Sequence, residues 1–426
     1  MTQKKEQAVG DVIAEFVVQV ESLATSLPLA MAVIQGAHRA AHKSYDDFVE
    51  KNCKEETKSE ASYILVPVEL DDRYNVLKKR VRQTSTAYSV VPRSFLVSLI
   101  SSNDAFLGKL VIALFRIRPE MLKSSDRTLT YSQLSEFGSI GQAKEHLLEK
   151  EVETLLRKSH TEQFDWLESK FAVKLRVDLP VWPTFIEVTE RRNLFVHSDG
   201  IVSSQYVKVC GEHGAALDTG IKPGSRLEVP HTYFKFAYEA VFEIAVKLGQ
   251  VLWRKLKPSE IAAADEALST VCYDLLKERQ YRLSQKLLDF ACSSPMKHAT
   301  EKDRLIFLVN RAQAYKWDGN SKRALEIIAE QDWSATGTTF QLAAAVLRDE
   351  YSVAVSLMES IGANGDPSKT AYKTWPLFRE IRKNKTFTDT FEKIFGEPFE
   401  RATPVEKTSP TPEEGPDGSE PPTTVQ

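Results

Sequence analysis

Apolar residues recur every three to four positions along most of this chain, and that period predicts amphipathic α-helices. Residues 200–230 interrupt the pattern with five glycines, so we expect a loop there, with a short strand pair within 201–209. Residues 92–118 form either one helix or two helices broken near Ser101. We therefore expect an all-α fold whose first part holds helices at 8–26, 29–52, 68–82, 92–118, 131–156, 161–174 and 231–255.

The second half of the chain predicts stacked helical hairpins. The hairpin at 303–330 resembles a tetratricopeptide repeat, because small residues precede an Asp-Gly-Asn turn, although the period is irregular. Residues 401–426 are rich in Pro, Glu, Thr and Ser, which predicts disorder. The expected domains are a helical domain at 1–255, tetratricopeptide-like repeats at 256–360 with hairpins at 262–292, 303–330 and 338–360, a helical cap at 361–400 and a disordered tail at 401–426.

Composition narrows the class of protein. The 426 residues carry a net charge of −3, which excludes a protein that coats nucleic acid through a general basic surplus. Local basic patches exist at 78–82 and 191–192, where a solvated helix face is the plainer interpretation. The four cysteines form no C-x-x-C pair, as in a reducing cytoplasm. We find neither a signal sequence nor an uninterrupted run of about 20 apolar residues, and so expect no membrane contact.

One predicted helix, 184–198, carries several side chains that could take part in catalysis. Pro183 suits its first turn and Gly200 suits its end. An arginine followed after four to six residues by a histidine arises by chance about once in a chain of this composition. The chain contains such a second copy, Arg226 and His231, but Pro230 prevents that copy from lying on one continuous helix.

The copy in the predicted helix has a richer context. Arg192, Asn193 and His197 lie within two turns, and Asn193 and His197 share a face at i,i+4. Glu190 lies on the same stripe, whereas Phe185, Val188 and Phe195 can face a core. This combination resembles the HEPN superfamily (higher eukaryotes and prokaryotes nucleotide-binding), whose ribonuclease members carry Arg-x(4–6)-His, often with a polar residue after the arginine. The resemblance covers residues 1–255, and only 187–206 is specific.

The resemblance implies a helical bundle that dimerises, joins two copies of the motif in one cleft and cleaves RNA without a metal.

The residues alone support that chemistry. RNA carries its own nucleophile, the 2′-hydroxyl. His197 can transfer protons, and Arg192 can donate to phosphate oxygens. Asn193 can orient either group, and Glu190 can orient Arg192. A surface salt bridge of Arg192 with Glu187 or Glu190 is the structural alternative. Arg191 and Tyr206 are further candidates, as residues that support the site. For Tyr206, packing as an aromatic side chain in the core is the simpler explanation.

Other motifs give no second site. His38 and His42 lie at i,i+4, but Arg39 stands where a zinc protease would have glutamate, and no third ligand is evident. No phosphate-binding glycine loop occurs. The aromatic residues of 371–397 fit a core better than a base-stacking platform. We therefore expect neither a metal nor a cofactor.

Three functional hypotheses follow. The first is a cytoplasmic, homodimeric endoribonuclease in bacterial phage defence or a toxin-like system, with RNA as substrate and the repeats free to bind a protein. The second is a non-catalytic scaffold that dimerises or binds RNA or protein partners. A third and weaker one is a module that binds a nucleotide ligand in the same cleft. DNA is not expected as a partner.

Overall fold

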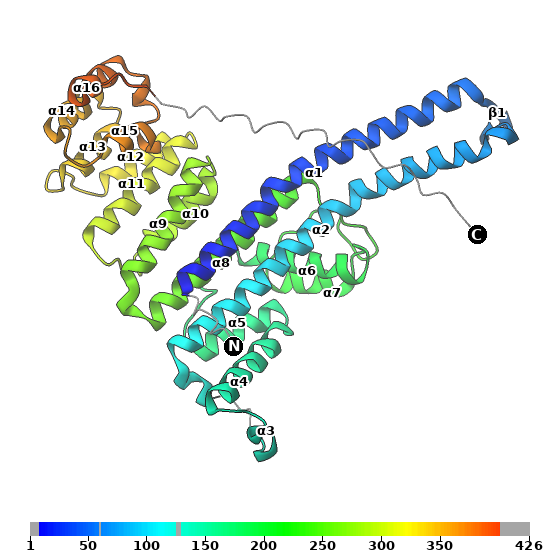
Figure 1. Ribbon diagram of the computed structural model, residues 1–426, viewed down its shortest axis with the longest axis horizontal. Coiled ribbons are helices and arrows are strands. Elements are labelled where there is room, and N and C mark those ends of the chain that lie inside the picture. Colours follow the sequence, from blue (N-terminus) through cyan, green and yellow to red (C-terminus); the bar gives the residue numbers. More distant parts are fainter. Residues whose placement is uncertain (1–7, 59–60, 125–128, 401–426) are drawn as a thin grey trace, which may run out of the picture. The chain divides into compact units, whose positions relative to one another are not determined.

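The computed structural model describes residues 8–58, 61–124 and 129–400. Most of this part of the chain is α-helix, so the all-α fold class is confirmed (Figure 1). The chain divides into two compact units, residues 1–331 and 332–426. The disordered tail expected at 401–426 lies outside the described residues.

Two long helices form an antiparallel hairpin at the start of the first unit: α1 spans Val9–Asn52 and α2 spans Asp71–Ile117 (Figure 1). Four shorter helices were expected here, so that expectation was wrong. Pro28 and Pro92 lie inside the observed helices. A proline costs one backbone hydrogen bond, and continuous packing of α1 against α2 can offset that cost. An antiparallel strand pair that the helical period did not predict, β1 Lys54–Lys58 and β2 Ala61–Leu65, joins the helices.

The rest of the first unit packs around the base of this hairpin. The main hydrophobic core extends from Val9 to Ala314, and a second, smaller cluster consists of Leu194, Val202, Tyr206, Cys210 and Leu227. Residues 204–212 form helix α7, which corrects the strand pair expected there. The extended backbone between α6 and α8 makes one isolated bridge, Ile201 with Arg226, among the described residues. The helices that follow α2 are α3 Tyr131–Ser135, α4 Ile140–Leu156, α5 His160–Phe171, α6 Trp182–His197, α7 Ser204–Glu212 and α8 His231–Leu256.

All three expected helical hairpins are present as helix pairs. The first two belong to the first unit, and the third belongs to the second unit. Their helices are α9 Ile261–Lys277 with α10 Tyr281–Ala291, α11 Glu301–Trp317 with α12 Ser321–Ala329, and α13 Thr338–Leu347 with α14 Tyr351–Ile361. Short 3-10 turns lie at Val68–Leu70, Pro119–Ser124, Pro258–Glu260, Pro376–Phe378 and Ile381–Lys383.

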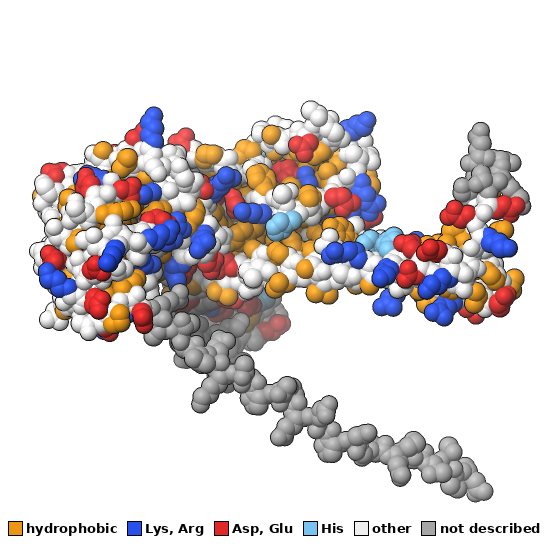
Figure 2. Space-filling model, turned by 90° about the horizontal axis from the view of Figure 1, so that it is seen from above, with side chains coloured by type: hydrophobic (Ala, Val, Ile, Leu, Met, Phe, Trp, Pro, Cys, Tyr) orange, Lys and Arg blue, Asp and Glu red, His pale blue; other side chains and the backbone are white. Residues whose placement is uncertain are grey.

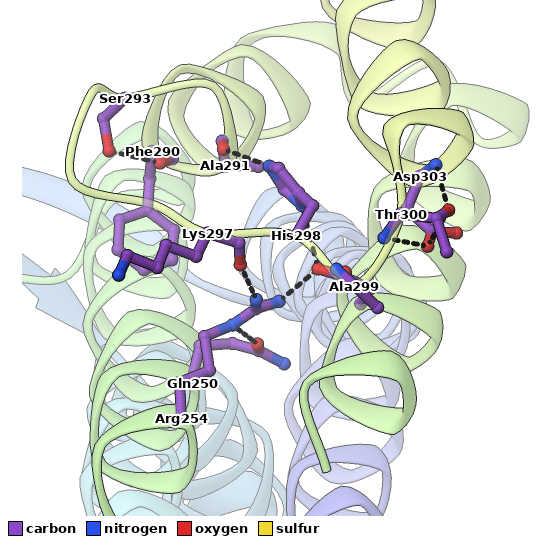
Figure 3. Close-up of polar contacts among 11 residues, drawn as sticks. Gln250, Arg254, Phe290, Ala291, Ser293, Lys297, His298, Ala299, Thr300 and Asp303 are labelled. Atoms are coloured by element: carbon purple, nitrogen blue, oxygen red, sulfur yellow. Dashed lines mark hydrogen bonds and ion pairs between the residues drawn. The ribbon is translucent and has the colours of Figure 1, made fainter. Parts of the chain in front are cut away.

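The boundary expected at residue 255 does not separate compact units. Arg254 near the end of α8 donates to the buried carboxylate of Asp265 in α9 at 2.7 Å. The same carboxylate accepts from the backbone N–H of Ala299 at 2.8 Å and contacts the ring of His298 at 2.9 Å (Figure 3). Because a buried charge must be paired, this network fixes α8 against the first hairpin. The division falls instead between residues 331 and 332.

The second unit holds the expected cap in its own small core. Helix α15 spans Lys369–Thr374 and α16 spans Lys385–Phe395. Tyr372, Phe378 and Phe387 are fully buried and contact one another through their rings. These aromatic residues form a core, as their helical spacing predicted.

Two helical segments are long and apolar enough to cross a membrane by length and composition alone, Val9–Asn52 and Val68–Ile117. Polar residues interrupt every long apolar run in these two segments, but the mean hydropathy of the qualifying window in each segment remains high. A helix that packs in the core of a soluble protein meets the same criteria, and half of the qualifying window in the second segment is buried.

Candidate active site

Helix α6 begins and ends where its sequence predicts. Pro183 lies in its first turn, and its C-terminal residue is His197. Gly200 follows with a φ of +79°, and its N–H donates to the Leu194 carbonyl at 3.0 Å. Phe185 and Val188 are buried in the core. The polar face of the helix is thereby directed away from that core.

Arg192 lies at the centre of a half-buried polar cluster on α6. One end of its guanidinium is paired with the carboxylate of Asp104 from α2. Its other terminal nitrogen donates to Asn193 Oδ1 at 3.3 Å, and Asn193 Nδ2 donates to Glu190 Oε1 at 3.4 Å. Three of the expected residues are therefore in contact. Asp104 has the role that was expected of Glu190, since Glu190 contacts Asn193 instead.

His197 is separate from this cluster. The histidine is exposed at the end of α6, and among the described residues no hydrogen bond or ion pair holds its ring. One chain thus assembles Arg192, Asn193 and Glu190, and presents His197 to solvent beside them on the same helix. No contact between His197 and Arg192 closes the site within one copy.

Two histidines that sequence reasoning did not select adjoin the cluster. His160, the first residue of α5, is buried and lies with Nε2 at 3.0 Å from Asp104 Oδ1. His213, which follows α7, contacts the Thr161 hydroxyl at 3.1 Å and accepts a bond from Trp182 Nε1 at 3.4 Å. Both lie close enough to Glu190 to favour its charged form.

Asp104 carried a sequence signal that could have identified it. It is the only acidic residue in α2 after Asp72, and it stands in a strongly apolar stretch. An acid in such a stretch is rarely buried without a partner. The partners themselves, Arg192 and His160, come from distant parts of the sequence, so spacing along the chain could not reveal them.

Burial raises the pKa of the Glu190 carboxyl. His160, the Asn193 amide and Arg192 act in the opposite direction by favouring its carboxylate form. Desolvation is the larger effect, so Glu190 binds a proton at higher pH than an exposed glutamate does. A carboxyl of this kind beside a guanidinium is a candidate for proton transfer.

Arg191 and Tyr206 belong to a different cluster, which is structural. Arg191 is buried and donates to Glu187 Oε1 at 2.7 Å, while its guanidinium lies 3.8 Å from the centre of the Tyr233 ring. The hydroxyls of Tyr206 and Tyr233 donate to the two oxygens of Glu187 at 2.6 and 2.7 Å. These contacts join α6 to α7 and α8. Arg191 and Tyr206 therefore support the site by holding its helix.

A third group holds the segment that follows α6. Arg93 of α2 is buried, pairs with Asp199 and Glu228, and lies over the Phe195 ring. Arg226, the arginine of the second copy of the pattern, also pairs with Asp199. Pro230 precedes α8, so Arg226 and His231 lie on no common helix, as the proline predicted.

Within the described ranges, no group of three or more His, Cys, Asp or Glu side chains could hold a metal ion. His38 and His42 contact each other edge to face at 4.4 Å between ring centres. His38 Nδ1 is hydrogen-bonded to the Thr84 hydroxyl at 3.2 Å.

A scan against protein-family models, a search of curated proteins and a search of solved structures each return no match.

Proposed function

We propose that the protein is a metal-independent endoribonuclease of the HEPN type that acts as a homodimer. The observation that carries the proposal is the half-buried Arg192, held by Asp104 and Asn193 on the helix that exposes His197 at its end. A preorganised guanidinium can stabilise the anionic transition state of phosphodiester cleavage, and a solvent-facing imidazole can transfer one of its protons. A role in phage defence or a toxin-like system belongs to this proposal through the family resemblance.

The proposed reaction uses only groups of the protein and the RNA. A base removes the proton of the 2′-hydroxyl, and the 2′-oxygen forms a bond to phosphorus. The bond from phosphorus to the 5′-oxygen breaks, and an acid protonates that oxygen. The products are a 2′,3′-cyclic phosphate and a 5′-hydroxyl. Arg192 stabilises the anionic transition state, and His197 transfers protons.

The dimer follows from the position of His197. In one chain its imidazole faces solvent and makes no contact with the cluster of Arg192, Asn193 and Glu190. A two-fold axis near the end of α6 would bring the His197 of each copy to the cluster of the other. The apolar side chains of Val196 and Ile201, which are 49% and 37% exposed, adjoin His197 and would be covered in such a contact.

Cleavage in EDTA by wild-type protein and by Arg192→Ala and His197→Ala tests the proposal. We expect each variant to lose at least about 100-fold in rate, because each removes a group that acts in the transition state. The matched controls, Arg157→Ala and His231→Ala, alter exposed residues and should cleave like wild type. The fragments should end in a 2′,3′-cyclic phosphate.

A non-catalytic scaffold is the alternative, and one observation favours it. The pairing of Arg192 with Asp104 already satisfies part of the guanidinium, as a purely structural arginine would require. In that case wild-type protein would bind RNA or a protein partner without cleaving RNA, and Arg192→Ala would lower stability. Growth arrest of the host that depends on His197 would count against the scaffold even if purified protein needed an activator.

A further inference from the structure

The outer part of the α1–α2 hairpin projects from the core of the first unit. We call residues 28–91 the arm (Figure 1). Among the described residues of the arm only Ala41 and Phe48 are buried apolar side chains. Helix-to-helix contacts such as Tyr45 with Tyr74 and His38 with Thr84 hold it together. Such a long exposed element contributes little to the core, so its surface is available for another role.

Charges are segregated along the two helices of the hairpin. Residues 22–45 and 73–103 contain no Asp or Glu, whereas the tip between them is rich in acidic residues. An ordinary solvated helix mixes both signs. Six exposed basic side chains on the arm form what we call the basic segment: Arg39, Lys43, Lys78, Lys79, Arg80 and Arg82. Figure 2 shows Lys and Arg side chains along this projecting hairpin.

No acidic side chain neutralises the basic segment. Across residues 8–58, 61–124 and 129–400, none of its six members makes an ion pair with Asp or Glu, and Lys78 lies over the Tyr74 ring instead. Unpaired cations in such density repel one another, which costs stability unless a polyanion binds. Such a density of unpaired cations on an element outside the core therefore points to a ligand.

The basic side chains also surround α2. Positions 77 and 81 are half-buried against α1. At 100° per residue, Lys78 and Arg82 lie on one flank of α2, Lys79 lies opposite α1, and Arg80 lies on the other flank. A flat lipid surface could meet only one of these directions at a time. A curved polyanion can follow several of them.

The spacing relates the basic segment to the candidate active site. Arg82 and Asp104 lie on the same continuous helix, 22 positions apart. At 1.5 Å per residue this is about 33 Å along the helix. Asp104 holds Arg192, so one continuous helix connects both regions.

We propose that the basic segment of the arm binds the phosphate backbone of a structured RNA and directs its cleavable strand toward Arg192. The choice of RNA as the polyanion rests on the proposed function. A stem whose phosphates contact the basic segment would place its loop near α6. Recognition would be through phosphates, and thus dependent on salt and independent of sequence.

Fluorescence anisotropy with a labelled RNA stem-loop, in EDTA and across about 50–200 mM salt, tests the arm directly. Arg192→Ala with His197→Ala serves as the background, so that the probe stays intact. Changing Lys78, Lys79, Arg80 and Arg82 together to Gln should lower the slope of log affinity against log salt by about 3, at 0.7–0.9 per phosphate contact. Affinity at low salt should fall about 10-fold or more.

The matched control changes Lys144, Lys150, Arg157 and Lys158 on and just after α4 to Gln, which removes the same charge from the same unit. An equal loss in this control, or an unchanged slope in the arm variant, would overturn the inference. Arm-dependent sedimentation with phosphatidylserine vesicles, together with an unchanged RNA slope, would overturn it in favour of a lipid surface. Thermal melting of both variants verifies that they fold.

The two proposals can fail separately. Arm-dependent RNA binding by a wild-type protein that never cleaves RNA would support the arm and reject the nuclease. Cleavage by Arg192 and His197 with an arm-independent salt slope would reject the arm and support the nuclease.

Discussion

Arg191 and Arg192 are adjacent in sequence and lie in different surroundings. Arg191 points into the core, where Glu187 and Tyr233 satisfy it. Arg192 points toward a half-buried cluster in which Asp104 and Asn193 hold it. A rotation of 100° per residue separates the two side chains on α6 and gives one an anchoring role and the other access to a ligand.

Gly200 determines where the chain turns after His197. Its φ is +79°, and a Cβ there would lie 2.8 Å from Phe195 Cε1 and 3.2 Å from the Leu227 carbonyl oxygen. We expect Gly200→Ala to lower the free energy of unfolding by about 1–3 kcal/mol, because the backbone conformation is strained for any L-residue. Urea denaturation measures this change.

Gly211→Ala is the matched control for Gly200. Position 211 lies in helix α7, and a Cβ there meets nothing within 4 Å. Alanine should be neutral or stabilising by about 0.5–1 kcal/mol at such a site. If both variants unfold at the same urea concentration, the strain at Gly200 is not significant. RNA cleavage by Gly200→Ala should also decrease, since His197 lies three residues earlier.

Helix α1 meets α8 and α9 through a half-buried carboxyl. Burial of Glu21, with the carboxylates of Glu278 and Asp274 close by, raises its pKa to about 7. Tyr238 of α8 also faces this group. The contact therefore holds a glutamate that binds a proton near neutral pH, at a position where three helices pack together.

The raised pKa of Glu21 predicts how stability depends on pH. The folded protein binds this proton more tightly than the unfolded chain, whose glutamate has its ordinary pKa of 4.5. The stabilising contribution is complete below about pH 4.5 and is lost as pH rises through about 7. Glu21→Gln should remove that dependence, so its urea midpoint relative to wild type should rise from pH 5 to pH 8.

The exposed Glu50 on the same helix supplies the control, and Glu50→Gln should follow the wild-type curve. Parallel curves for wild type and Glu21→Gln across this pH range would contradict the prediction. Curves that separate progressively between about pH 4.5 and 7 and run parallel above that range would support it.

At the scale of the whole molecule, the proposed site is incomplete in one chain. We expect a mass in solution of twice the 48.0 kDa chain by analytical ultracentrifugation. Val196→Asp with Ile201→Asp should weaken the dimer at least about 30-fold, because charges replace apolar contacts in its centre. RNA cleavage should decrease in parallel, while Arg192 and His197 are unchanged.

Val353→Asp alters an apolar residue of similar exposure in the second unit and should leave both mass and cleavage unchanged. A wild-type monomer that cleaves RNA at full rate would contradict the composite site. A double variant that stays dimeric and active would show that the two copies meet elsewhere.

The local period of the sequence predicted much of the fold because helix formation depends on residues three and four apart. It located helix α6, its end before Gly200 and the helical hairpins of the second half. The same period predicted breaks in α1 and α2 near Pro28 and Pro92. It contains no information on the packing of the two helices against each other along their length. It also missed α7, whose glycine-rich surroundings favour a loop locally, whereas Tyr206 and Cys210 are buried by tertiary contacts.

Arg192, Asn193 and His197 were identifiable from sequence alone because all three lie within two turns of one helix. Their surroundings were not, because Asp104 and His160 come from helices 88 and 32 positions away from Arg192 in sequence. Only tertiary packing brings those groups within bonding distance, and it also determines which of two adjacent arginines is buried. The sequence by itself determined the order of helices and the position of the motif. The packing of α2 and α5 against α6 decided that Arg192 is held in a polar cluster while His197 faces solvent.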